Sequence, residues 1–218
     1  NYTDLKNSKE EIMKFDKVLV SVGRKPYTEG LNLAKVGIKK DNKGRIEVNE
    51  KLQTSIKNIY AIGDVSGPPL LAHTASFEGT LVAEHISGKK VEPMDYNNVP
   101  SCTYTHPEVA SVGLSEEEAL SEGFELNVGK FPFSALGKTL AEGDRDGFVK
   151  IIYDKKYGEL LGCHIIGKNA TNLITEVSIA RNLESTFTEL LNTIHPHPTL
   201  SEAIHEATAD AFNEAIHI

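Results

Sequence analysis

The chain has 218 residues, of which 39% are hydrophobic and 25% charged, and its formal net charge is −8. This composition is that of an ordinary globular protein, and the negative charge argues against nucleic acid or an anionic membrane surface as a partner. No apolar run approaches the ~20 residues that a membrane-spanning helix needs, and no signal peptide is visible.

The two cysteines, Cys102 and Cys163, lie far apart in the sequence and form no C-x-x-C motif. Two cysteines in a chain of this size indicate a reducing compartment more than a disulfide framework. We expect both to be buried, inert thiols. The other interpretation, a redox pair, requires a spatial proximity that sequence alone does not show.

The opening segment, residues 1–23, has the pattern expected for the end of a larger unit that begins upstream. It begins at Asn1 and not at Met, with a polar, hairpin-like start and then a β-branched run at 16–22 that predicts a buried strand. We therefore expect the sequence to be a fragment of a longer chain. The next predicted elements are a short helix or turn at 31–37, short strands at 45–48 and 59–62, and a helix at 73–86.

A linker rich in turn-forming residues, 87–100, is the best domain boundary. Beyond it, Ser115 and Glu118 form a capping box that predicts a helix at 115–120. Strands are predicted at 127–133, 147–153 and 159–166, the last two joined as a hairpin, and helices at 169–182 and 199–216. These elements form an antiparallel sheet with helices segregated to it, so the fold class that we predict is α+β.

The most informative motif is HPHPTLSE, residues 195–202, at the start of the last predicted helix. The prolines restrict the backbone, and a rigidly held imidazole with a carboxylate five residues on is what an acid–base pair needs. A simpler interpretation stays open, because Thr199 and Glu202 also form a helix capping box and His195 and His197 could be ordinary loop histidines. The two roles of Glu202 are not exclusive.

A second motif is the strand at 59–62 that ends in Gly63-Asp64, with a helix a few residues later. Open α/β sheets bind ligands at the carboxyl ends of their strands. Gly63 would let a ligand approach the backbone, and Asp64 would offer a carboxylate to hydroxyl groups. The alternative is a strand-ending turn in which Asp64 bonds its own backbone.

These two motifs resemble the C-terminal active-site signature and the second FAD motif of the flavin disulfide reductases. The spelling HPHPTLSE is most similar to that of the dihydrolipoamide dehydrogenase group. Two further segments resemble the same family in order along the chain: SVGRKP at 21–26 is similar to the last strand of its NAD domain, and HPEVASVG at 106–113 to the opening of its dimerisation domain.

The resemblance implies a role for each motif residue. His197 would be the general acid–base for a dithiol substrate, Glu202 would orient its ring, and His195 would sit beside it without being the base. The family also implies a cis bond between His197 and its proline. Asp64 would bind a ribityl hydroxyl of FAD, and Gly23 would contact the nicotinamide cofactor, NAD. The start of the helix would lie under the flavin, where its N–H groups stabilise negative charge, through Leu70, Leu71, Ala72 and His73.

The resemblance also implies an organisation into three segments. Residues 1–26 would be the tail of the NAD-binding domain, 27–96 the C-terminal segment of the FAD-binding domain, and 97–218 the dimerisation domain. The expected activity is the oxidation of dihydrolipoamide with NAD⁺, through FAD and a redox disulfide. The expected partners are a second copy in a homodimer and the lipoyl domain of the acyltransferase of a 2-oxo acid dehydrogenase complex. The expected location is the cytoplasm, or the mitochondrial matrix in a eukaryote.

The departures from the family pattern leave alternatives open. The sequence has no G-x-G-x-x-G and no closely spaced redox cysteines, so we expect these upstream of Asn1 and expect the isolated chain to be inactive. A glutathione reductase-like disulfide reductase shares the His–Glu pair and is a rival enzyme. A mercuric reductase would be expected to end in a vicinal cysteine pair, which residues 211–218 lack. A non-catalytic dimerisation module is the alternative from another class.

Overall fold

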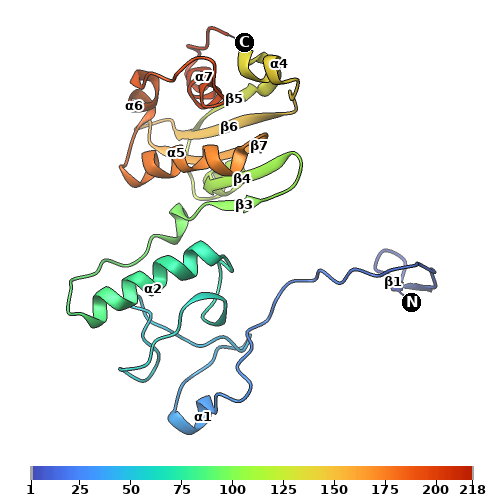
Figure 1. Cartoon of the computed structure of the whole chain (residues 1–218), viewed down its shortest axis with the longest axis vertical. Coiled ribbons are helices and arrows are strands. Elements are labelled where there is room, and N and C mark those ends of the chain that lie inside the picture. The colour runs from blue at the N-terminus through green and yellow to red at the C-terminus, as the bar shows by residue number, and fades with distance from the viewer. Residues whose placement is uncertain (1, 218) are drawn as a thin grey trace.

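The computed structural model describes residues 2–217 and shows two lobes and an extended N-terminal arm (Figure 1). The larger lobe, residues 101–217, contains the main sheet. The smaller lobe, residues 27–95, contains the long helix α2 (Ala72–Ile86). The short helix η2 (Tyr96–Asn98) lies in the connection between the lobes.

The sheet of the larger lobe is antiparallel throughout, with the strand order β3-β4-β7-β6-β5. The predicted hairpin is confirmed, because β6 and β7 pair along their length with Ile151 opposite Cys163. Successive side chains point to opposite faces, so β5, β6 and β7 each supply apolar residues to two layers. The strands are β3 (Ser101–Thr103), β4 (Glu108–Gly113), β5 (Leu126–Pro132), β6 (Gly147–Asp154) and β7 (Leu160–Gly167).

Helices cover both faces of this sheet. On one face, α5 (Ala170–Asn182) contacts β4 and β7, and α7 (Glu202–Ala211) contacts β5 and β6. The opposite face packs against α3 (Glu116–Ser121), whose Ala119 is fully buried. The lobe is therefore α+β, as predicted. The main core lies under α5 and α7 and includes the large buried side chains Phe131, Phe133, Ile151, Tyr153, Ile165, Ile174 and Ile204.

Helix caps explain where several helices begin. The predicted capping box is confirmed at α3, where the Ser115 N–H donates to Glu118 Oε2 at 2.8 Å and the Glu118 N–H donates to Ser115 Oγ at 3.2 Å. A second box, Thr186 with Glu189, begins α6 (Phe187–Asn192), which the sequence analysis did not predict although the T-x-x-E signal is present. The short α4, residues 137–142, likewise lies in a segment for which no helix was predicted.

The last helix is shorter at both ends than the predicted 199–216. It begins at Glu202, its N-cap position is Ser201 with no side-chain cap, and the Thr199 hydroxyl donates instead to the carbonyl of Pro196 at 2.7 Å. It ends at Ala211, and Asn213 at φ 59° has left the helical conformation. One half of the predicted capping box remains, since the Thr199 N–H donates to Glu202 Oε2 at 2.8 Å.

The smaller lobe has little regular structure before α2. The short helix or turn predicted at 31–37 is confirmed as the helix α1 (Leu33–Val36), which ends at Gly37 because this residue takes the left-handed conformation at φ 78°. The strands predicted at 45–48 and 59–62 are wrong, because each region contributes only an isolated bridge. A strand persists only where neighbouring strands complete its hydrogen-bond ladder, and these short segments pack instead around a small core. The buried members of that core are Ile38, Ile46 and Ala61.

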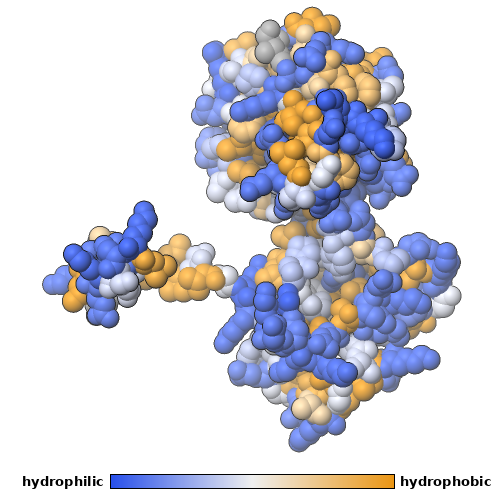
Figure 2. Space-filling view, turned by 180° about the vertical axis from the view of Figure 1, so that it is seen from behind, coloured by the Kyte–Doolittle hydropathy of each residue, from blue (hydrophilic) through white to orange (hydrophobic). Residues whose placement is uncertain are grey.

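The N-terminal arm, residues 2–26, departs most from expectation. It starts with the expected exposed hairpin, β1 (Tyr2–Asp4) paired with β2 (Lys9–Glu11). The buried strand predicted at 16–22 is wrong, since this stretch has no strand pairing and Leu19 is 90% exposed. Figure 2 shows hydrophobic residues at the surface of the arm. Within residues 2–217 no strand pairs with this run, so its β pattern has no ladder to join.

Candidate active site

The structure brings together the histidine and the carboxylate that the sequence singled out. His197 Nδ1 lies 2.8 Å from Glu202 Oε1. The imidazole is on the loop before α7 and its side chain is 73% exposed, whereas Glu202 is in the first turn of α7 and is mostly covered. The His197–Pro198 peptide bond is cis, as expected from the resemblance. This arrangement is a solvent-facing imidazole held from behind by a carboxylate.

Glu202 holds the loop with both of its oxygens. Oε1 contacts the His197 ring, and Oε2 accepts the hydrogen bond from the Thr199 N–H at 2.8 Å. Partial burial raises the pKa of Glu202, but the bonds from Thr199 and His197 outweigh this effect and hold the pKa below its usual value. The carboxylate is therefore ionised at neutral pH. Glu202 therefore has both of the roles considered for it: Oε1 orients the His197 ring, and Oε2 accepts the capping hydrogen bond from the Thr199 N–H.

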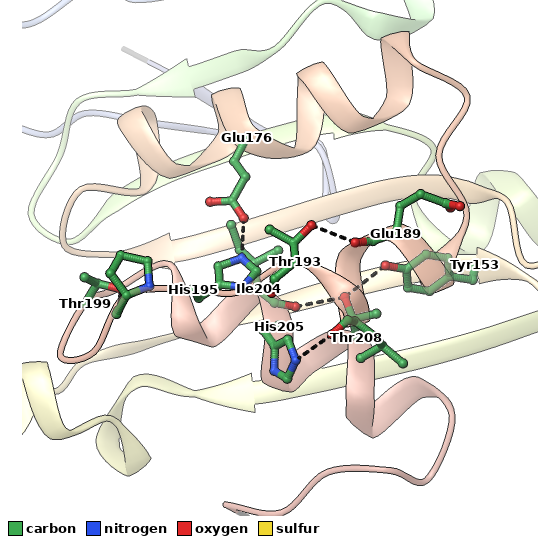
Figure 3. Close-up of polar contacts among 11 residues, drawn as sticks. Tyr153, Glu176, Glu189, Thr193, His195, Thr199, Ile204, His205 and Thr208 are labelled. Atoms are coloured by element: carbon green, nitrogen blue, oxygen red, sulfur yellow. Dashed lines mark hydrogen bonds and ion pairs between the residues drawn. The ribbon is translucent and has the colours of Figure 1, made fainter.

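The second histidine of the motif occupies a different environment. The His195 side chain is only 7% exposed, and its Nε2 lies 2.6 Å from Glu176 Oε1 on α5 (Figure 3). The other ring nitrogen, Nδ1, lies 3.0 Å from the carbonyl oxygen of Thr193. The hydrogen bond to Glu176 raises the pKa of His195, against the opposing effect of burial. Sequence reasoning missed Glu176, since no local pattern links it to a histidine nineteen residues later.

The second predicted motif forms a separate cluster in the smaller lobe. The Asp64 carboxylate lies in the helix η1 (Gly63–Val65), and its Oδ2 lies 2.6 Å from Arg24 Nη1 of the arm. Gly63 has φ 69°, and a Cβ there would come within 3.0 Å of the Ala75 Cβ, so only glycine fits without strain. No sequence pattern predicted Arg24 as the partner of Asp64, because forty residues separate the two.

Glu78 of α2 holds this turn in place. It is buried, its Oε2 accepts from the Gly63 N–H at 2.6 Å, and its Oε1 accepts from the Tyr96 hydroxyl at 2.7 Å. Burial and the nearby Glu78 raise the pKa of Tyr96 to about 12, so the phenol keeps its proton. The carboxylate thus ties the residue before Asp64 to the connection between the lobes.

The residues before and at the start of α2 present backbone donors. Its N-cap position, Leu71, makes no side-chain cap, and its first turn carries no acidic residue. Ala72 and His73 are exposed, Leu70 and Leu71 are partly so, and the His73 ring lies 2.8 Å from the Pro100 carbonyl through Nε2. The helix therefore leaves the N–H groups of its first turn open to an anionic or carbonyl oxygen.

Gly23 lies apart from both sets of contacts. It is exposed on the arm at φ 95°, and a Cβ there would meet no atom within 4 Å. Its neighbour Arg24 is the residue that reaches Asp64. The Asp64 cluster belongs to the smaller lobe and its junction with the arm, and the His197–Glu202 pair to the larger lobe, so the two motifs form separate groups in one copy of the chain (Figure 1).

The two cysteines differ in burial and are not placed to form a disulfide. Cys163 on β7 is fully buried, whereas Cys102 on β3 is partly exposed, so the expectation that both are buried is wrong for Cys102. Strand β4 lies between β3 and β7. Since neighbouring strands are ~4.8 Å apart, the two Cα atoms are at least about 9 Å apart, beyond the ~7 Å that a disulfide spans.

Residues 2–217 contain no cluster of three or more histidine, cysteine or acidic side chains suited to hold a metal ion. Over the same residues, no helix combines the length and apolar character needed to cross a membrane.

Family models match both parts of the chain. Residues 99–208 match the dimerisation domain of the pyridine nucleotide-disulphide oxidoreductases, and residues 1–79 match a second model described as pyridine nucleotide-disulphide oxidoreductase. The first match covers the sheet, α5 and most of α7, including His197 and Glu202. The chain belongs to the pyridine nucleotide-disulphide oxidoreductases, a family that uses flavin and nicotinamide cofactors.

The curated relatives narrow the resemblance to one group. The chain is 50% identical to the dihydrolipoyl dehydrogenase of Bacillus subtilis over 93% of its length, and 48% identical to the mitochondrial enzyme of Caenorhabditis elegans over 95%. The mitochondrial enzyme of Sus scrofa is 47% identical over 95%. The chain spans 41–42% of the length of these three relatives.

Solved structures of the family share the fold. The chain matches LpdA of Mycobacterium tuberculosis with a TM-score of 0.81 and 29% identity, over 86% of this chain and 41% of that one. It matches the HOCl-induced flavoprotein disulfide reductase RclA of Escherichia coli with a TM-score of 0.81 and 26% identity, over 87% and 44%. These likenesses agree with an α+β interface lobe of a disulfide reductase.

Proposed function

We propose that this chain supplies the acid–base residues and part of the flavin site of a dihydrolipoyl dehydrogenase, which oxidises dihydrolipoamide with NAD⁺. The observation that carries the proposal is the 2.8 Å contact between His197 Nδ1 and Glu202 Oε1 in an imidazole that faces solvent. The identity of 43–50% to dihydrolipoyl dehydrogenases over nearly the whole chain supports the same substrate class.

The contact determines which nitrogen can act as the base. An ionised carboxylate accepts hydrogen bonds only, so the proton of the neutral His197 ring sits on Nδ1 and the lone pair on Nε2. Nε2 can then take the proton of a substrate thiol. The thiolate so formed is the nucleophilic species, and the Glu202 carboxylate stabilises the imidazolium that the transfer leaves behind. Glu202 thus orients the base and balances its charge.

The residues near Asp64 fit a flavin. The Asp64 carboxylate can accept from ribityl hydroxyls, and the open N–H groups of α2 can donate to the oxygen where a reduced flavin carries negative charge. Gly63 itself is buried, with its N–H bonded to Glu78, so its contribution is the turn at φ 69° that presents Asp64 and not an approach of the ligand to its own backbone. When bound, FAD supplies the passage of electrons from the thiol substrate to the nicotinamide. We assign Gly23 and the arm to the binding of NAD, which receives the electrons from FAD.

The proposed enzyme works as a homodimer. The acid–base pair and the Asp64 cluster form separate groups in one copy, so we propose that His197 and Glu202 act with the flavin segment of a second copy across a two-fold axis. The sequence has no G-x-G-x-x-G and no redox cysteine pair, so we expect the 218 residues alone to be inactive. The macromolecular partner would be the lipoyl domain of a 2-oxo acid dehydrogenase complex, in the cytoplasm or the mitochondrial matrix.

The test is His197→Gln in the full-length enzyme that carries this sequence. Removal of the base should lower lipoamide turnover by ~10²–10⁴-fold while the visible flavin spectrum is unchanged. His85→Gln, at the far end of α2, is the matched control and should keep its activity. Unchanged turnover in His197→Gln would contradict the acid–base assignment. The rival assignment as a glutathione reductase-like enzyme predicts turnover of glutathione disulfide, and the same preparation tests it.

A further inference from the structure

Two histidines that are two residues apart have opposite surroundings. The His197 side chain is open to solvent, whereas the His195 side chain is enclosed between α5 and the loop before α7. His195 also packs at 5.5 Å between ring centroids against His205 of α7. The titratable groups that face His195 are therefore Glu176 from α5 and Glu202 and His205 from α7.

The partners of the His195 ring fix its charge. Nδ1 meets the Thr193 carbonyl at 3.0 Å and Nε2 meets the Glu176 carboxylate at 2.6 Å (Figure 3). Neither an ionised carboxylate nor a carbonyl oxygen can donate a hydrogen bond, so both ring nitrogens must carry a proton. A ring with two N–H groups is an imidazolium. It has no lone pair with which to accept a proton, so His195 does not act as a base.

The hydrogen bond between His195 and Glu176 differs from the other bonds of the loop in the element that it reaches. Within the described part of the chain, the other hydrogen bonds of residues 195–199 go to the loop itself or to Glu202. The bond from His195 to Glu176 alone reaches across to α5. Helix α5 packs on β4 and β7 in the main core, with Ile174 and Val177 buried, so it is a rigid reference for the loop.

We propose that Glu176 and His195 are positioning residues, which anchor the loop to α5 and thereby place the His197 ring. The inference rests on the proposed function and deepens it, because it assigns the two histidines of the motif to different tasks. His195 is the fixed cation that sets the geometry, and His197 is the base. A partly buried ion pair adds little stability compared with apolar packing, but it strongly disfavours other arrangements of the loop.

The experiment is imidazole ¹⁵N NMR of the full chain between pH 5.5 and 9, with wild type, Glu176→Gln and Glu176→Asp. In wild type, both His195 nitrogens should keep the chemical shift of protonated nitrogen above the pH at which free histidine becomes neutral. In Glu176→Gln the pKa of His195 should fall towards its ordinary value, and the single set of His197 ring signals should broaden or split. Glu176→Asp keeps the negative charge on a shorter side chain. It should restore the protonation of His195, but it should restore the sharp His197 signals to a smaller extent.

The control is Glu117→Gln, which removes one carboxylate from an exposed position on α3. It should leave both histidines unchanged. A wild-type His195 that titrates like free histidine would overturn the proposal, as would His197 signals that do not respond to Glu176→Gln. A purely structural contact would lower the urea midpoint in Glu176→Gln and leave the His197 signals sharp. These outcomes are independent of turnover, so an active His197→Gln enzyme would remove the proposed function without touching this result.

Discussion

Gly129 is the position where one methyl group should disturb the active-site helix most. It lies in β5 against α7, and a Cβ there would overlap the carbonyl oxygen of Ala207 and come within 2.6 Å of the Ala211 nitrogen. Both are backbone atoms, so no side-chain rotation relieves the clash and α7 must move from the sheet. Because Glu202 is in the first turn of α7, the same displacement acts on the orienting carboxylate.

The size of the effect follows from two opposing terms. Overpacking a core costs ~1–3 kcal/mol, and the rigid backbone on both sides places this site at the upper end. The loss of glycine's freedom in the unfolded chain offsets ~0.4–1 kcal/mol. Gly129→Ala should therefore lower the free energy of unfolding by about 2 kcal/mol, which raises the unfolding equilibrium constant about 30-fold.

The assay is urea unfolding followed by circular dichroism at 222 nm, with Gly137→Ala as the matched control. Gly137 is in the same lobe at the start of α4, and its Cβ would make an ordinary 3.6 Å contact with His197 Cε1. Alanine is the better helix former, so this control should be neutral or more stable by up to ~1 kcal/mol. Equal urea midpoints for the two variants would refute the packing argument.

Three further predictions concern other parts of the chain. Glu184 has φ 54°, so Glu184→Gly should raise the free energy of unfolding by about 0.5–1 kcal/mol in urea, whereas Glu184→Ala keeps the Cβ and should gain nothing. The lowered pKa of Glu202 means that its stabilisation is present above the unfolded value of ~4.3 and is lost as the pH falls through the folded pKa. The difference in midpoint between wild type and Glu202→Gln should therefore be present at pH 7 and vanish in acid. Burial raises the pKa of the Cys163 thiol, so a thiol reagent should modify at most Cys102 in the native chain and both thiols in urea; rapid modification of two thiols without denaturant would contradict the burial.

Local signals in the sequence predicted much of the larger lobe. The Ser115–Glu118 capping box and the hairpin of β6 and β7 depend on residues close together in the chain, so both can be predicted without knowledge of the fold. The contact of His197 with Glu202 is of the same kind, since only five residues separate them. Attention to T-x-x-E patterns would have found α6 as well, through Thr186 and Glu189.

What sequence reasoning missed depends on contacts between distant segments. Glu176 reaches His195 only because α5 and the loop before α7 pack on the same face of the sheet. Arg24 reaches Asp64 across forty residues, by way of an arm whose path no local pattern describes. The strand predicted at 16–22 is wrong for a related reason. The stretch has the β-branched pattern of a strand, but a strand forms only where a second strand pairs with it.

That unpaired run also affects how the chain behaves at high concentration. An exposed, extended stretch rich in valine and leucine offers free backbone N–H and C=O groups on both edges, which is the template on which a second extended segment adds. Lys17 within the run and Lys14 and Lys25 beside it oppose this addition, because stacking identical copies would bring these like charges together. Salt screens such repulsion, so self-association of the chain should increase with ionic strength as well as with concentration.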